Sequence, residues 1–287
     1  MQDSLKRGAL FAVTAAAAFS ITGVCIKAAS ATVGNEMIVF CRSGVSFLSL
    51  LPWMLRDGAR GVRTQRPGGH LWRASFGVCA MYCFFYAIAK LPLAAAMLLT
   101  YSTPLYVPFI AWLWIAERPP AIVFPAALVG LAGIGMIVHP TVSFDVAAGL
   151  IGLLAGIFAA CAMVSIRRIS DTEPASRIVF YFAALSTLIS AVPMLWKWQT
   201  PAPTETVLLI ATGLSATAGQ LCLTRAYVLA PAARIGPFTY CSVIFSALLA
   251  WALWGETLDR WFAPGAALVI ATCVMVGWQR KEPQLEE

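Results

Sequence analysis

Long apolar stretches alternate with short polar connections along the whole chain. A helix needs about 20 predominantly apolar residues to cross a lipid bilayer, and the pattern predicts ten helices of roughly that length. The connections, such as GVRTQRPGGH and AERPPA, are too short to form a soluble catalytic domain. The predicted spans are 8–29, 34–55, 71–90, 92–115, 120–138, 147–166, 177–196, 205–229, 231–254 and 259–278.

Composition supports a membrane-embedded chain. Of the 287 residues, 60% are hydrophobic and 11% are charged, and the mean hydropathy is +0.80. Soluble domains carry about 25% charged residues, so lipid is the predicted solvent for most of this chain. The surplus of 20 Lys and Arg over 13 Asp and Glu does not indicate a nucleic-acid partner, because most of these residues lie in short connections.

The distribution of basic residues predicts the orientation in the membrane. Short cytoplasmic loops of membrane proteins are enriched in Lys and Arg. With the N-terminus inside, the inner segments (connections together with the adjoining span ends) hold most basic residues, including Arg56, Arg63 and Arg73, whereas Lys90 and Lys197 are among the few outside. We therefore expect a multi-pass protein in the lipid bilayer with both termini in the cytoplasm.

One stretch of the chain is repeated. LLTYSTPLYVPFIAWLWIAE begins at residue 98, and PFTYCSVIFSALLAWALWGE begins 139 residues later. At this offset Thr100 matches Thr239, Tyr101 matches Tyr240, and Pro, Ala-Trp and Glu positions also coincide. The repeat predicts two units, residues 1–140 and 141–287.

The two units contain five predicted spans each. Because five is odd, the second unit enters the membrane from the opposite side, as in secondary transporters built from inverted repeats. The predicted fold is therefore an all-α membrane protein with ten transmembrane helices in two inverted five-helix repeats. In such transporters the substrate site lies near the middle of the membrane, between the halves. A structural membrane protein could also contain a repeat.

Three segments carry a resemblance to a known family. AKLPLAAAMLLTYSTPLYVPFIAWLWIAERPP and AYVLAPAARIGPFTYCSVIFSALLAWALWGETL each resemble the later part of an EamA domain, the repeat of the drug/metabolite transporter superfamily. VFCRSGVSFLSLLP, around Arg42, is similar to the second helix of that domain. The resemblance covers nearly the whole chain.

This resemblance implies alternating-access export across a bacterial inner membrane. Overall similarity to bacterial aromatic amino-acid exporters implies aromatic and other neutral amino acids as substrates. A transporter of another metabolite, such as a nucleotide sugar, is the first alternative. An intramembrane enzyme or assembly factor is the second, but it would need a buried catalytic constellation that the sequence does not show.

Polar residues inside the predicted spans are candidates for binding a small-molecule substrate. Pro104 leaves the carbonyl of Thr100 without its helical donor, and Gln220 carries a large amide that needs partners at lipid depth. Either residue could instead serve only helix packing. The candidate substrate-binding residues are Tyr82, Tyr101, Gln220, Tyr240, Ser242, Ser20, Thr100 and Lys27.

Charged residues inside spans are expensive and usually have a function or a partner. Arg42 lies well inside the second predicted span, where it could attract a substrate carboxylate or serve a structural role, and we favour the structural role. Lys27 is close enough to a span end to reach the interface. No Asp or Glu occupies the middle of any predicted span. This absence argues against lipophilic cations as substrates and leaves a carboxylate proton relay without a carrier.

Other kinds of chemistry find no support in the sequence. The chain contains no phosphate-binding loop, nucleophile elbow or metal motif, and its eight cysteines all lie in apolar stretches, where they are typical of helix packing. We therefore expect no enzyme activity, no cofactor, no metal and no use of ATP. Whether the protein is a monomer or a homo-oligomer is left open.

Overall fold

A computed structural model describes residues 2–56, 62–91, 96, 99–100, 102–117, 119–138, 146–255 and 260–277. Within these residues the fold is entirely helical, and no strand is present. The helices are α1 (Gln2–Ala29), α2 (Asn35–Arg56), α4 (Pro67–Lys90), α6 (Thr103–Ile115), α7 (Val123–Val138), α8 (Val146–Ile169), α9 (Ala175–Lys197), α10 (Pro203–Leu229), α11 (Ala232–Ile235), the 3-10 helix η1 (Gly236–Tyr240), α12 (Cys241–Trp254) and α13 (Phe262–Gly277).

The helices agree with the predicted spans in position. In the described part of the chain, seven helical segments are long and apolar enough to cross a membrane. Three shorter apolar helices, Leu105–Ile115, Val123–Gly133 and Ala263–Thr272, fall within the other predicted spans. The chain is thus a multi-pass membrane protein, while the full set of ten crossings stays a prediction.

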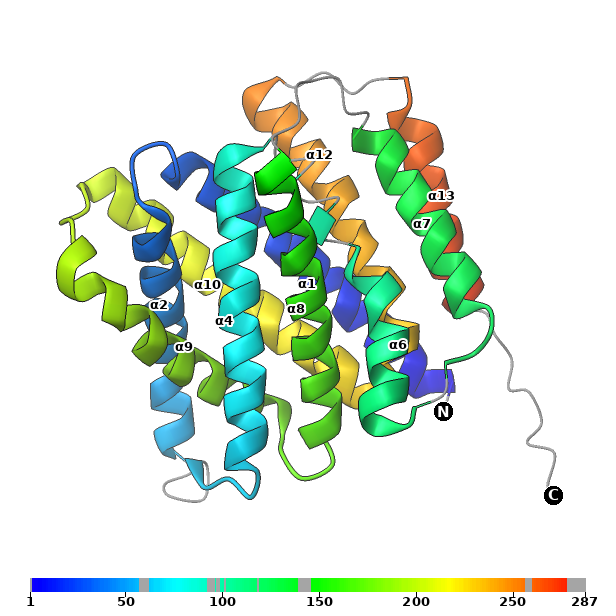
Figure 1. Cartoon of the computed structure of the whole chain (residues 1–287), viewed down its shortest axis with the longest axis horizontal. Helices are drawn as coiled ribbons and strands as arrows, with labels where there is room; N and C mark the ends of the chain where they lie inside the picture. Colours follow the sequence, from blue (N-terminus) through cyan, green and yellow to red (C-terminus); the bar gives the residue numbers. More distant parts are fainter. Residues whose placement is uncertain are drawn as a thin grey trace.

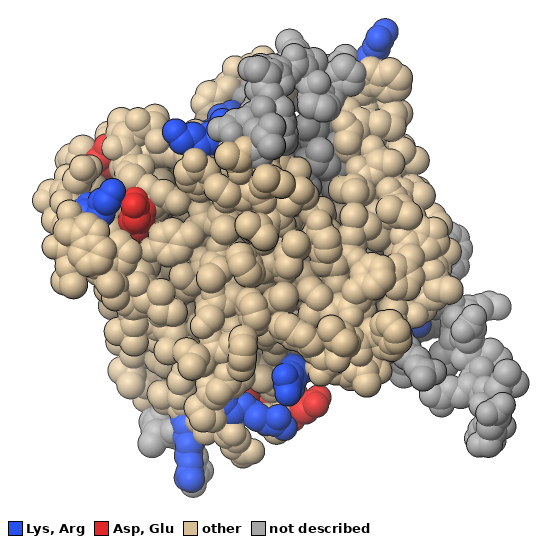
Figure 2. Space-filling model, in the orientation of Figure 1, with Lys and Arg blue, Asp and Glu red and all other residues tan. Residues whose placement is uncertain are grey.

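The outer surface suits contact with lipid tails. Leu195 is 83% exposed and Leu113 is 80% exposed, and many other large apolar side chains are also exposed. Figure 2 shows charged side chains toward the upper and lower edges of this face, with a broad uncharged area between them. Soluble monomers rarely expose apolar patches larger than a few hundred Å², so this area is explained by burial in a bilayer.

Helices from the two halves of the chain pack against each other in matching pairs. Helix α1 packs against α10 and α12, while α8, the first helix of the second half, packs against α4 and α6. Helix α2 packs against α9, and α7 packs against α13 at one side of the bundle (Figure 1). Figure 1 also shows α1 and α8 running in opposite directions. Corresponding helices therefore have corresponding partners.

Glycines in α8 allow its close approach to the segment before α6. A Cβ atom at Gly156 would lie 2.9 Å from the Oγ of Ser102 and 3.0 Å from the carbonyl oxygen of Leu99. A Cβ atom at Gly152 would lie 3.0 Å from the side chain of Leu99. Small residues at this four-residue spacing let helix backbones pack closely in membranes, so the sequence feature GLIGLLAG has a packing role.

The structure shows how the chain accommodates the proline in the fourth predicted span. Helix α6 begins at Thr103, with Pro104 in its first turn, where a missing N–H does no harm. The Oγ1 of Thr103 donates a hydrogen bond of 2.6 Å to the carbonyl oxygen of Thr100. The carbonyl that Pro104 leaves without a helical donor is thus satisfied by a side chain beside the break.

The ninth predicted span is broken in a similar way. Instead of one helix over residues 231–254, the chain forms α11, η1 and α12 in succession. Pro237 lies within the 3-10 segment, and the Oγ1 of Thr239 donates to the carbonyl oxygen of Gly236 at 2.7 Å. A proline removes a backbone donor from a helix, which explains why this segment does not continue as one α-helix.

Two turns have the same conformation but different buried residues. The turns at 30–34 and 170–174 join α1 to α2 and α8 to α9, and they show the same backbone pattern. Val33 is buried in the first turn, and Glu173 is buried at the equivalent place in the second. The carboxylate of Glu173 accepts hydrogen bonds from Thr64 Oγ1 at 2.6 Å and from Arg177 Nη1 at 2.9 Å. One end of the bundle is therefore held by an apolar contact and the other by an ionic cluster.

Candidate substrate-binding cavity

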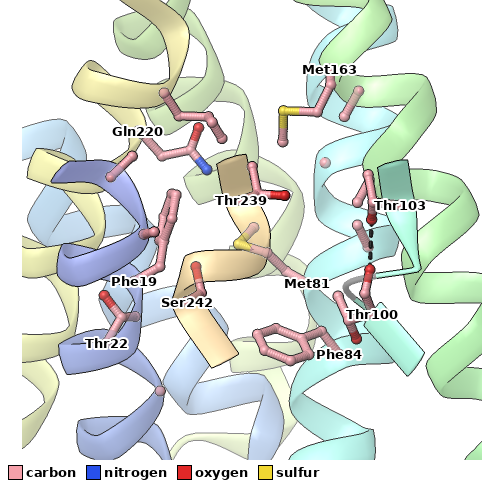
Figure 3. A pocket seen from close by; sticks show the side chains of 18 of the residues that line it. Phe19, Thr22, Met81, Phe84, Thr100, Thr103, Met163, Gln220, Thr239 and Ser242 are labelled. Atoms are coloured by element: carbon pink, nitrogen blue, oxygen red, sulfur yellow. Dashed lines mark hydrogen bonds between the residues drawn. The ribbon is translucent and has the colours of Figure 1, made fainter. Parts of the chain in front are cut away.

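A cavity of about 150 Å³ lies among α1, α2, α4, α6, α8, α9, α10, η1 and α12, and Figure 3 shows part of its lining. Most of its lining is apolar, with Phe19, Phe84 and Met163 among the larger side chains. A mostly apolar cavity with a few convergent polar groups is typical of a small-molecule site. The polar or charged residues that line it are Thr22, Arg42, Arg73, Thr100, Thr103, Gln220, Tyr227, Thr239 and Ser242.

Three of the residues proposed from the sequence line this cavity. Thr100, Gln220 and Ser242 come from three different parts of the chain, and Figure 3 shows them around one space. The hydroxyls of Thr100 and Ser242 are buried and have no hydrogen-bond partner among the described residues. Buried hydroxyls usually have a partner, so these two are available to a bound molecule.

Two other candidates hold helices together next to the cavity. Ser20 Oγ donates to the carbonyl oxygens of Ala16 and Ser242, both at 2.9 Å, and so connects α1 to α12. The hydroxyl of Tyr240 donates to the carbonyl oxygen of Ala127 in α7 at 3.0 Å. Neither residue is among the described lining residues. Their contacts position the start of α12.

The remaining three candidates are not brought to the cavity by the described structure. Tyr82 in α4 has a buried hydroxyl without a partner among the described residues, but it is not one of the lining residues. The ammonium group of Lys27 lies 4.7 Å from the ring centre of Trp254, at the end of α1. Tyr101 lies outside the described residues.

Arg73 was not predicted to be a cavity residue. It was counted among the basic residues of the inner segments, at the inner end of the predicted span, whereas α4 begins at Pro67 and places Arg73 well inside the helix. Arg73 is 2% exposed, and its Nη2 donates to the Oε1 of Gln220 at 3.0 Å. The sequence did indicate the earlier helix start, because proline is favoured in the first turn of a helix. A start at Pro67 places Arg73 deeper in the membrane than the interface.

Arg42 and Arg73 are two buried cations in one cavity. Arg42 is 4% exposed, and its Nη1 donates to the Sδ of Met81 at 2.6 Å. Among the described residues, no carboxylate forms an ion pair with either arginine. The Nε and Nη1 atoms of Arg73 also lack a hydrogen-bond partner there. A buried charge without a partner costs several kcal/mol, so this pair needs an explanation beyond packing.

The ring of Phe182 lies beside both guanidinium groups, and Gly77 leaves space for that of Arg73. The guanidinium carbons of Arg73 and Arg42 lie 4.0 Å and 5.6 Å from the ring centre of Phe182. A cation near an aromatic ring face gains about 0.5–2 kcal/mol. At Gly77 a Cβ atom would collide with the guanidinium of Arg73 and with the Phe182 ring. Glycine at this position therefore makes room for the contact.

A family model and individual relatives indicate the same kind of protein. The model of the EamA-like transporter family matches residues 6–139 and again residues 147–278. A pseudopaline exporter, CntI, from Pseudomonas aeruginosa (strain UCBPP-PA14) is 36% identical over 97% of this chain and 99% of its own length. A riboflavin transporter from Vibrio cholerae is 26% identical over 98% of this chain and 96% of its own length.

A more distant relative and a solved structure are also similar over nearly the whole chain. An S-adenosylmethionine uptake transporter from Rickettsia prowazekii is 23% identical over 98% of this chain and 97% of its own length. A crystal structure with 18% sequence identity superimposes with a TM-score of 0.78, covering 93% of this chain and 95% of its own. These relatives are named for different small metabolites, so they support small-metabolite transport and not aromatic amino acids in particular. The chain belongs to the EamA-like transporter family.

Proposed function

We propose that this protein is a secondary transporter that exports a small metabolite across the bacterial inner membrane, with the cavity as its substrate site. The observation that carries this proposal is the position of the cavity, which is lined by helices from both halves of the chain. A site between two structurally related halves is where secondary transporters bind their substrates. The direction of transport is supported by the exporter at 36% identity.

The pairing of helices supports alternating access between inverted repeats. The contacts of α1 with α10 and α12 correspond to those of α8 with α4 and α6. If the two halves exchange these packings, the cavity opens first to one side of the membrane and then to the other. In this proposal both termini are cytoplasmic, and the two family matches at 6–139 and 147–278 are the two repeats.

Neutral amino acids are the first substrates to test, as the family resemblance implies. The Phe19 and Phe84 side chains offer apolar contact, and Thr100, Gln220 and Ser242 offer hydrogen bonds. If a neutral amino acid is the substrate, labelled tryptophan, phenylalanine or threonine enters proteoliposomes without an imposed pH gradient. Gln220→Ala should lower this flux by roughly ten- to hundredfold, because one or two lost hydrogen bonds cost about 1–3 kcal/mol.

The matched control is Gln65→Ala, which removes an exposed amide from the connection before α4. It should leave the flux unchanged. All variants must be compared at equal amounts of inserted protein. If none of the three amino acids enters, the amino-acid assignment is wrong. If Gln65→Ala reduces the flux as much as Gln220→Ala, the cavity is not the substrate site.

A further inference from the structure

We infer that the substrate carries at least two carboxylate groups, which pair with Arg42 and Arg73. This inference rests on the proposed function, because it assigns a substrate class to the same cavity. It replaces the neutral amino acid, which the resemblance implies, with a dianion that the cavity itself favours.

The balance of charge in the cavity favours a dianion. The described lining contains two arginines and no Asp or Glu. A neutral amino acid would bring one carboxylate and one ammonium group, so the total charge of the occupied cavity would stay at two positive charges. A molecule with two carboxylates neutralises both guanidinium groups. Since unpaired buried charges are costly, the dianion gains most from binding.

The cavity also has buried hydrogen-bond donors that lack a partner among the described residues. The Nε and Nη1 atoms of Arg73 are buried and have no hydrogen-bond partner among the described residues. The hydroxyls of Thr100 and Ser242 are also buried and have no hydrogen-bond partner among the described residues. Guanidinium groups bind carboxylates through paired N–H donors, and such charge-assisted bonds are about twice as strong as neutral ones. The unfilled positions thus match carboxylate oxygens.

The two guanidinium groups lie close enough together for one short molecule to contact both. Arg42 comes from α2 and Arg73 from α4, and both guanidinium groups lie over the ring of Phe182 from α9. Their central carbons are therefore no more than about 10 Å apart, which is the sum of their distances to the ring centre. A short molecule can reach both with its two ends. The apolar lining, including Phe84 and Phe85, suits the hydrocarbon part between the carboxylates.

Two series of compounds test the inference, and within each series the members differ mainly in charge. Glutarate, its monoamide and its diamide have nearly the same shape but carry two, one and no carboxylates, and isophthalate with its amides forms an aromatic series. Binding is measured as a rise in the unfolding temperature of the protein in lipid nanodiscs. We expect at least one dianion to bind about tenfold or more tightly than its monoamide, because one charged hydrogen bond contributes about 1.5–3 kcal/mol. The diamides should not bind.

Arginine variants show where the dianion binds. In Arg42→Gln and Arg73→Gln the dianion should bind no better than the monoamide binds to the unaltered protein. Arg73→Lys keeps the charge and should retain part of the preference. Arg168→Gln, which removes an exposed arginine at the end of α8, is the matched control and should bind like the unaltered protein. Without ligand, Arg73→Gln should unfold at the same or a higher temperature, because it removes a buried charge that has no ion-pair partner among the described residues.

The other possible results would contradict either the inference or the proposed function. Equal binding of a dianion and its monoamide would overturn the inference. So would an absence of binding together with a lower unfolding temperature of Arg73→Gln, which would make the arginine structural. Transport of tryptophan that depends on Gln220, without dianion binding, would refute the substrate class and leave the transport function intact. If neither amino acids nor dianions respond to substitutions in the cavity, the proposed function itself is wrong.

Discussion

Gly77→Ala is expected to weaken substrate binding by roughly ten- to hundredfold while the protein stays folded. The new Cβ atom would collide with the guanidinium of Arg73 and the ring of Phe182, so one of these groups must move. A displaced guanidinium loses at least one charge-assisted hydrogen bond to a substrate carboxylate, at a cost of about 1.5–3 kcal/mol. The measurement is dianion binding in nanodiscs, with the apparent unfolding temperature recorded on the same sample.

Gly68→Ala is the matched control for this change. Gly68 lies in the first turn of the same helix, and a Cβ atom there would meet no other atom within 4 Å. Alanine is a better helix former than glycine by about 1 kcal/mol, and both variants share this gain. Unchanged binding in Gly77→Ala would show that Arg73 does not need its observed position. Equal losses in both variants would point to an effect on the helix as a whole.

Glu173→Gln is expected to lower the apparent unfolding temperature by roughly 3–10 °C at neutral pH. The carboxylate accepts hydrogen bonds from Thr64, from Arg177 and from the backbone N–H of Gln65 at 2.8 Å. An amide cannot accept all three with the same strength, and a hydrogen bond to a charged group contributes about 1.5–3 kcal/mol. The cluster connects the α8–α9 turn to the segment before α4, so its loss loosens one end of the bundle.

The same cluster makes stability depend on pH. Burial raises the pKa of the Glu173 carboxyl, but the hydrogen bonds from Thr64, Arg177 and Gln65 outweigh it and hold that pKa below its usual value. A carboxyl with a lowered pKa in the folded state stabilises the protein above its unfolded pKa of about 4.3. This contribution is lost as the pH falls through the folded pKa. The unfolding temperature should therefore fall below about pH 4 more steeply in the unaltered protein than in Glu173→Gln.

Glu36→Gln provides the comparison. Glu36 forms a partly exposed ion pair with Lys197 at 3.7 Å, and such surface pairs contribute about 0–1 kcal/mol. Its loss should change the unfolding temperature by much less than the loss of Glu173. If the two variants behave alike, or if the pH profile of Glu173→Gln matches that of the unaltered protein, the buried cluster does not contribute as the geometry indicates.

Much of the fold follows from local features of the sequence. Apolar length predicts the helices, because the lipid environment requires each crossing to satisfy its backbone groups internally. The break before α6 follows from Pro104, which removes one backbone donor. The division of the ninth span into α11, η1 and α12 was not predicted, since Pro237 lies near its start and could equally have belonged to the first turn of a single helix.

The site was less predictable than the fold. Whether a polar residue faces the cavity depends on the rotation of each helix, and the sequence does not specify that rotation well. Ser242 lines the cavity, whereas Tyr240, two residues earlier, contacts α7. Arg73 was counted with the basic residues of the inner segments because the predicted span began at residue 71, four residues after the observed start of α4, and so placed Arg73 at the inner end of that span. A helix start one turn earlier thus places Arg73 in the cavity and not at the membrane interface.

The two cavity arginines have a consequence for the energy source of transport. In a cell whose interior is electrically negative, the membrane potential favours the cytoplasm-facing state of an empty, doubly positive cavity by up to about 2.3 kcal/mol per charge per 100 mV. A bound dianion cancels that charge, so the loaded protein turns outward without opposition from the potential. The voltage alone would then drive export without a coupled ion. Flux of a bound dicarboxylate in proteoliposomes should rise when valinomycin and K⁺ make the loaded side negative, and a flux indifferent to voltage would rule this out.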